Sequence, residues 1–271
     1  MKRSIFATPY ALWMAIFTIL PVVFVAYYAF TDKTGSLSMA NWENFFTPGN
    51  LQTMWVSVYL ALQCTLICLI VGYPAAYFLA SRDFSKNRTL FVLILLPMWM
   101  NFLLRTYAMR ALLLDAGVIN TMLEWLGVGR RQLLNTQGAV LLGMVYNFLP
   151  FMILPIYTCL RKFDHRVIEA AEDLGANPVQ VFLRVTMPLS VPGVVSGITM
   201  VFMPAVTTFA ISRLLGGGMT YLIGDMIESL FMTFRNWNYG STISLILMAL
   251  IIGSIAILRK VDPNNEGGGA W

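Results

Sequence analysis

The sequence predicts an all-α integral membrane protein: one transmembrane domain over residues 1–271 with about six membrane-spanning helices. Hydrophobic residues make up 58% of the chain and charged residues only 11%, whereas about a quarter of the residues in soluble domains are charged. The mean hydropathy is +0.71. A helix needs about 20 mainly apolar residues to cross a bilayer. The segments that satisfy this are about 8–30, 54–80, 90–114, 138–160, 189–211 and 241–258.

The first two segments set the predicted orientation. Lys2 and Arg3 precede the first, whose apolar run is longer than that of a signal peptide and lacks a clear cleavage site, so we expect a retained span. The second ends just before a short loop that carries Arg82, Lys86 and Arg88. Basic residues favour the cytoplasmic side. Both termini and a loop at about 161–188 are therefore predicted to be cytoplasmic. The loops at about 31–53, 115–137 and 213–240 are predicted to lie outside.

The third segment has the least certain bounds, because Arg105 and Arg110 lie near its end. The cysteines all fall inside apolar segments without neighbouring histidine or carboxylate ligands, so we expect core packing and no metal site. The chain has no G-x-x-x-x-G-K-[ST] loop for nucleotide phosphates and no catalytic motif. We therefore predict a protein that is not an enzyme, binds no cofactor itself and has no role in nucleic-acid binding.

The cytoplasmic loop at 161–188 is predicted to form two short helices. Asp164 is placed to cap the first and Gly175 to end it in a left-handed conformation. Asn177 is placed to cap the second, with Pro178 at its first position. The small and apolar side chains of the first helix share one face, which needs a partner: Val167, Ala170, Ala171 and Leu174.

The same loop resembles the cytoplasmic signature of bacterial ABC importer permeases. That signature is E-A-A, three residues, G, nine residues, and then I-x-L-P. Here Glu169-Ala170-Ala171 is followed by Gly175 and by Val185-Thr186-Met187-Pro188, at the same spacing. The resemblance implies the type I ABC importer permease fold. It also implies a coupling helix that docks on a partner ATPase dimer, which binds ATP and Mg²⁺. The implied coupling residues are Glu169, Ala170, Ala171, Gly175, Val185 and Pro188.

Three further segments are similar to the first of the two permease subunits of spermidine/putrescine importers. They are residues 96–107, 115–120 and 207–224. This resemblance implies a multi-pass protein of the bacterial inner membrane that takes up polyamines delivered by an extracytoplasmic binding protein. It also implies a second permease subunit of the same fold, embedded with this one in the lipid bilayer. Arg213 departs from the pattern, since many of these permeases have an acidic residue there.

The candidate substrate pathway is drawn from polar and aromatic residues in or near the spans. Polar groups in a membrane tend to face the interior, and ammonium groups favour carboxylates and aromatic faces. Asp225 and Glu228 can share one helix face, being three residues apart. We expect Arg105 near the outer boundary, where it could snorkel to the interface or form an ion pair with Asp115 or Glu228, and we favour a structural ion pair over direct contact with the cargo. The full set is Trp99, Asn101, Arg105, Tyr107, Asp115, Asn147, Thr207, Thr208, Asp225 and Glu228.

Two alternatives stay open at this point. An importer of the same architecture for an anion or metal chelate would suit Arg105, Arg110 and Arg213. A secondary carrier or channel would need no ATPase, but such a protein has no reason to keep the Glu169-Ala170-Ala171 motif. The sequence does not fix the cargo, nor whether the permease pairs with itself or with a sibling.

Overall fold

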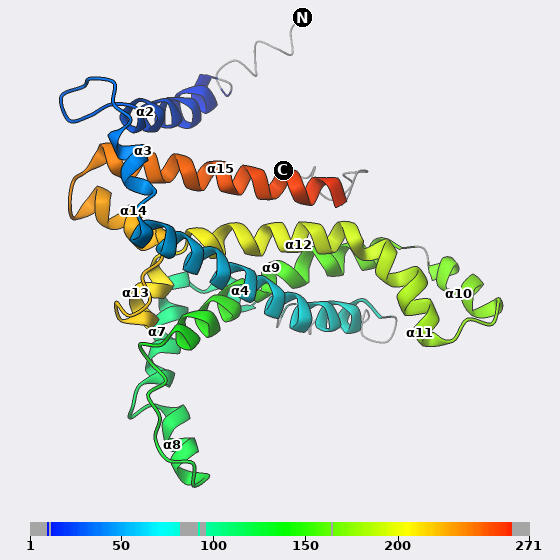
Figure 1. Cartoon of the computed structure of the whole chain (residues 1–271). Coiled ribbons are helices and arrows are strands. Elements are labelled where there is room, and N and C mark those ends of the chain that lie inside the picture. The colour runs from blue at the N-terminus through cyan, green and yellow to red at the C-terminus, as the bar shows by residue number, and fades with distance from the viewer. Residues whose placement is uncertain (1–9, 11, 82–91, 93–95, 164, 262–271) are drawn as a thin grey trace, which may run out of the picture.

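The structure is a computed structural model that describes residues 10, 12–81, 92, 96–163 and 165–261. Its core is a group of three long helices that contact one another pairwise: α4 (Pro48–Ala80), α9 (Gln137–Lys162) and α12 (Met187–Thr207) (Figure 1). Their contact is lined by fully buried apolar side chains, among them Leu60, Met144, Met152 and Val201. The predicted all-α membrane fold is confirmed.

The contact between α9 and α12 depends on two glycines. A Cβ atom on Gly193 would lie 2.6 Å from Cβ of Cys159 and 3.0 Å from the carbonyl oxygen of Pro155. A Cβ atom on Gly197 would lie 2.7 Å from Sδ of Met152. Small residues let membrane helices approach closely, which compensates for the weak hydrophobic driving force inside a bilayer.

A second layer is an antiparallel pair, α2 (Leu20–Ala29) and α15 (Trp237–Val261) (Figure 1). Polar contacts fix the end of this pair next to α3: the Asn238 side chain donates to the Thr31 carbonyl at 2.8 Å, and the Trp42 indole donates to the Ala29 carbonyl at 3.0 Å. The pair meets the three-helix core at α12 and through the short α14 (Ile223–Met232).

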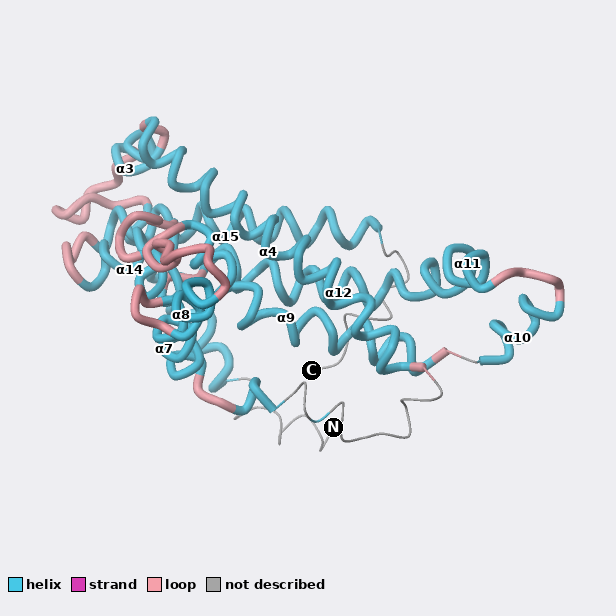
Figure 2. The backbone as a smooth tube through the Cα atoms, turned by 90° about the horizontal axis from the view of Figure 1, so that it is seen from below, coloured by secondary structure: helices cyan, strands magenta, loops and turns pink. Residues whose placement is uncertain are grey.

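The shorter elements gather at the two ends of the bundle. One end carries α10 and α11, and the other carries α3, α7, α8, α13 and α14 (Figures 1 and 2). The last described residues of α15 and the start of α2 point toward the α10 end. The bounds of the elements not yet given are α3 (Ala40–Phe45), α7 (Phe102–Leu113), α8 (Val118–Trp125), α10 (His165–Asp173), α11 (Pro178–Val181) and α13 (Ala210–Gly216).

Among the described residues, five helices are long and apolar enough to cross a membrane. They are Leu12–Ala29, Pro48–Ala80, Gln137–Lys162, Pro178–Thr207 and Trp237–Leu258. These correspond to five of the six predicted spans. Part of the remaining span, at 90–114, lies outside the described residues.

Two predicted spans are interrupted, which corrects the expectation of continuous helices. In the third, the chain leaves the helical conformation at Met100 and Asn101, and Asn101 Oδ1 accepts the Leu103 N–H at 2.8 Å to start α7. In the fifth, α12 ends at Thr207, Thr208 is extended, and α13 begins at Ala210. Interrupted helices leave backbone polar groups exposed, which a membrane tolerates only beside protein or a cavity.

Two π-helical turns, η1 (Ala15–Ile19) and η2 (Phe182–Thr186), have a shared cause. Each ends two residues before a proline, Pro21 or Pro188. A proline ring crowds the carbonyl of the fourth residue before it and lacks an N–H. The wider π turn removes that conflict, and the helix continues without a break.

Replacing Gly193 by alanine is predicted to weaken the α9–α12 contact. The added Cβ meets Cys159 Cβ and main-chain atoms of Pro155 and Ile156, so we expect a loss of about 1–3 kcal/mol in the free energy of unfolding. The matched control is Gly253→Ala, since a Cβ at Gly253 has nothing within 4 Å. Thermal unfolding in detergent should show a lower Tm for Gly193→Ala only. Equal Tm values for both variants would contradict this packing role.

Candidate coupling segment and substrate pathway

The end of α10 has the predicted left-handed turn. Gly175 has φ +85°, its N–H donates to the Glu172 carbonyl at 2.8 Å, and the Ala176 N–H donates to the Ala171 carbonyl at 3.1 Å. These two bonds satisfy carbonyls at the end of the helix, as in a Schellman motif. The predicted Asp164 cap lies outside the described residues.

The start of α11 also agrees with the sequence. Asn177 Oδ1 accepts the Gln180 N–H at 2.8 Å, and Gln180 Oε1 accepts the Asn177 N–H at 3.0 Å, which is a reciprocal capping box. Pro178 occupies the first turn. From there α11 continues through η2 into α12, so Pro178–Thr207 is one uninterrupted helical rod. Within it, Val185 is half-buried in η2 and Pro188 is exposed in the first turn of α12.

The two faces of α10 differ in what they meet. Its apolar residues remain exposed: Val167 by 48%, with Leu174 just beyond the helix by 89%, while Ala170 is exposed and Ala171 is half-buried. Behind α10 is a cavity of about 300 Å³, whose wall includes Ile168, Glu169 and Glu172. The ends of α4 and α9 form its far side. An apolar surface therefore faces away from the bundle, as a docking helix requires.

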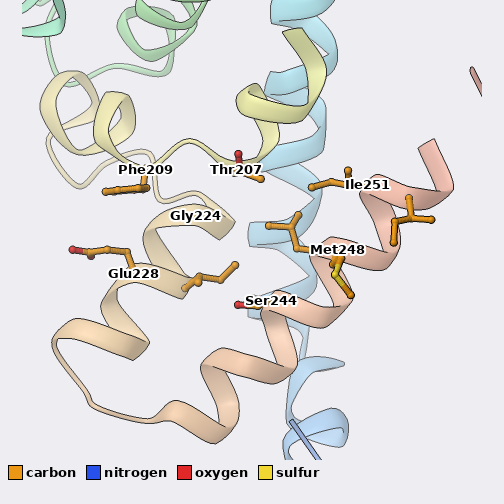
Figure 3. A pocket seen from close by; sticks show the side chains of 10 residues that line it. Thr207, Phe209, Gly224, Glu228, Ser244, Met248 and Ile251 are labelled. Atoms are coloured by element: carbon orange, nitrogen blue, oxygen red, sulfur yellow. The ribbon is translucent and has the colours of Figure 1, made fainter. Parts of the chain in front are cut away.

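At the opposite end, α12, α14 and α15 border a second cavity of about 390 Å³ (Figure 3). We call it the outer cavity, because it lies at the end of the bundle that carries the loops predicted to be outside. Thr207 and Phe209 border it at the end of α12, Glu228 comes from α14, and Ser244 and Met248 come from α15. Gly224 also lines it, and a Cβ there would lie 2.5 Å from the Thr208 carbonyl oxygen. Glycine therefore lets α14 pass directly against the end of α12.

Glu228 is paired with Arg213. Nη1 of Arg213 donates to Oε1 of Glu228 at 3.0 Å, and Nη2 donates to Oε2. Glu228 raises the pKa of Arg213 through this hydrogen bond. The expected pairing of Glu228 with Arg105 is wrong: in the described residues the ion-pair partner of Glu228 is Arg213.

Asp225, one turn earlier on α14, is buried and accepts the Leu222 N–H at 2.9 Å. Burial raises the pKa of Asp225, and contacts with Ser212 and the Leu222 N–H oppose that shift. Asp225 therefore serves to start α14, and the expected shared face with Glu228 is only partly realised, since Asp225 does not line the cavity.

Arg105 is buried on α7, with only 6% of its surface exposed. Its Nε and Nη1 have no hydrogen-bond partner in the described part of the chain. The predicted pairing with Asp115 is also wrong, because Asp115 follows the end of α7 and is exposed. On the neighbouring α9, Asn147 is fully buried, donates to the Gly143 carbonyl at 2.9 Å, and leaves Oδ1 without a partner.

The other predicted pathway residues do not line the outer cavity. Trp99 is 81% exposed and Tyr107 is 51% exposed, Asn101 caps α7, and Thr208 is buried at the end of α12. Of the predicted set, the structure places Thr207 and Glu228 at the cavity. Sequence reasoning missed Phe209, Gly224 and the residues of α15, since no local pattern shows that α15 lies opposite α14.

A family model for the inner membrane component of binding-protein-dependent transport systems matches residues 4–265. The chain belongs to this family. The permease is 41% identical over 252 residues to the spermidine/putrescine transport system permease protein PotB of Haemophilus influenzae, covering 89% of this chain and 88% of that protein. It is 34% identical over 254 residues to PotB of Escherichia coli, covering 91% and 92%.

The fold of the permease has a close counterpart among solved structures. A chain of a bacterial alginate ABC transporter, in complex with an alginate pentasaccharide-bound periplasmic protein, superposes with a TM-score of 0.82. The sequences are 15% identical, and the match covers 98% of this chain and 95% of the other. The predictions of an importer permease, of a multi-pass inner membrane protein and of a subunit that is not itself an enzyme are confirmed. Binding-protein-dependent transport implies an ATPase and a periplasmic binding protein as partners.

Two substitutions at Gly175 are predicted to show whether function there depends on the left-handed backbone conformation or on the absence of a side chain. Nothing lies within 4 Å of a Cβ built there, but φ is +85°. Asparagine tolerates this region far better than a β-branched residue. Gly175→Val should therefore reduce uptake and co-purification of the ATPase, by an amount equivalent to about 1–2 kcal/mol, and Gly175→Asn should lose much less. Equal losses would show that the conformation is not the constraint.

Replacing Arg105 by methionine is predicted not to lower stability. Two buried guanidinium nitrogen atoms without hydrogen-bond partners are costly, and a hydrophobic side chain of similar volume removes that cost. We expect an unchanged or higher Tm of the assembled transporter. A lower Tm would instead show that Arg105 has a stabilising partner in the assembled complex.

Proposed function

We propose that this permease forms half of the membrane pathway of an ATP-driven importer of polyamines, spermidine or putrescine, delivered by an extracytoplasmic binding protein. The observation that carries the proposal is the outer cavity, where the carboxylate-bearing Glu228 and the aromatic Phe209 lie on neighbouring elements. This combination suits an ammonium group. The two relatives described above, both spermidine/putrescine permeases, support the same cargo.

We propose that the movement produced by ATP hydrolysis is transmitted along one continuous helix, Pro178–Thr207. The ATPase would bind the exposed side of α10. The proposed coupling residues of this segment are Glu169, Ala170, Ala171 and Gly175. The capping box at Asn177 starts a helix that continues past Val185 and Pro188 to Thr207 at the outer cavity. Closure of the ATP sites, where the partner binds ATP and Mg²⁺, would therefore displace the cavity wall through a continuous helix.

The second half of the pathway is assigned to another permease subunit of the same fold in the same bilayer. Trp99, Asn101, Tyr107 and Asp115 lie on exposed surface and away from the outer cavity. In this proposal they reach the cargo across the interface with that subunit. Asn147 and Thr208, which are buried, support the neighbouring α7 and α13 and do not touch the cargo.

An anionic cargo is the second candidate, and one observation favours it. Arg105 has two buried nitrogen atoms without partners, which a negative group would satisfy. The argument is weakened at Arg213, because Glu228 already neutralises that guanidinium.

The test is uptake by proteoliposomes that contain the permease, its sibling subunit, the ATPase and the binding protein. Uptake of labelled spermidine should require ATP, be abolished by excess unlabelled spermidine, and be unaffected by an oxyanion or metal chelate. Glu169→Gln should slow uptake while the isolated ATPase keeps its activity. Uptake that is not competed by polyamines would refute the cargo, and transport without the ATPase would refute the coupling.

A further inference from the structure

The carboxylate of Glu228, a residue that borders the outer cavity, is already neutralised. Arg213 and Glu228 are 15 residues apart in the chain and lie on different short helices, yet they form a two-pronged ion pair. The Arg213 side chain is 54% exposed and that of Glu228 is 21% exposed. The guanidinium of Arg213 is therefore the more exposed member of the pair, and the carboxylate of Glu228 is the more buried one.

We infer that Arg213 is a resident counter-ion of Glu228, and that an ammonium group of the cargo displaces it during transport. This inference rests on the proposed function, and it assigns Glu228 as a cation-selecting residue and Arg213 as the competitor that keeps the site closed to weaker cations. It also accounts for a cation at position 213. The arginine neutralises the carboxylate until the cargo arrives, and it then moves aside, so it does not repel the cargo permanently.

The anion of the pair is fixed, whereas the cation is free to leave. The start of α14 is anchored to α4, because the Ile223 N–H donates to Oγ of Ser57 at 2.7 Å, and its first turn is closed by the Leu222 N–H, which donates to Asp225. Arg213 is joined to α13 only by a long, flexible side chain. A cargo ammonium would replace the contact with Arg213 by a contact of the same kind, so exchange of one cation for the other on Glu228 changes the free energy little.

The surroundings of Glu228 fit an alkyl amine. Phe209 and Glu228 extend to the same side, away from α15 (Figure 3), and Phe209 is 44% exposed. An ammonium on the carboxylate would thus lie near an aromatic ring. The apolar residues Leu247, Met248 and Ile251 of α15 line the other side of the cavity, which the carboxylate does not face (Figure 3).

Opposite effects of the two single substitutions distinguish exchange from a structural ion pair. At a limiting concentration of spermidine-loaded binding protein, Glu228→Gln should slow uptake by about tenfold or more, because the cargo loses its carboxylate. Arg213→Gln should instead speed uptake by about two- to fivefold, because the competitor is gone. The double variant should behave like Glu228→Gln. A structural pair predicts that both single variants slow uptake.

The charge swap Arg213→Glu with Glu228→Arg provides the decisive comparison. It can reform the ion pair, but it places a cation on the fixed helix. Exchange predicts that uptake stays low, whereas a structural pair predicts recovery. The matched control is Glu124→Gln, which breaks the exposed Arg130–Glu124 pair at 3.0 Å on and just after α8, away from the cavity, and should leave uptake unchanged.

The amount of assembled transporter and its ATP hydrolysis are measured for every variant, so that misfolding is recognised. If the unaltered transporter does not take up spermidine, the proposed function fails and the inference fails with it. If the unaltered transporter does take up spermidine, two results overturn the inference alone: uptake by Glu228→Gln equal to that of the unaltered protein, or recovery in the charge swap.

Discussion

The close approach of α9 and α12 at Gly193 and Gly197 is the contact on which the rest of the permease depends. It holds one continuous helix against the core and leaves the two ends of that helix to carry function. One end is the coupling segment around Gly175, and the other is the cavity at Thr207. A continuous helix that is supported from the side can pass a displacement from one of its ends to the other.

The interruptions of the helices place polar chemistry where a membrane would otherwise forbid it. When α12 stops at Thr207, the extended Thr208 turns the chain so that α13 carries Arg213 toward α14. Gly224 lets α14 lie against that break, which brings Glu228 to the cavity. The outer site is thus a consequence of a broken helix, and its charges are paired because unpaired charges in such a place are costly.

Features that depend on neighbours in the chain could be predicted from the sequence, and features that depend on distant contacts could not. The turn at Gly175, the capping box at Asn177 and the position of Pro178 follow from local backbone chemistry, and all three are present. The partner of Glu228 could not be found, because Arg213 approaches it only after two short helices have folded together. The break at Asn101 was missed for a related reason: an apolar stretch looks continuous until a capping side chain interrupts it. Hydropathy alone does not show such a break.

The π turn before Pro188 has a consequence for insertions and deletions in this loop. A π turn accommodates one residue more than an α turn, so the side chains before it are rotated by about 100° about the helix axis relative to an unbroken α-helix. Loss of a single residue within 182–186 would convert the π turn into an ordinary α-helical turn and rotate α10 about the helix axis. Val167 and Leu174 would then no longer face the docking partner. The number of residues in this stretch therefore fixes the rotation of α10 about the helix axis. A deletion of one residue would turn the docking surface of α10 away from the ATPase.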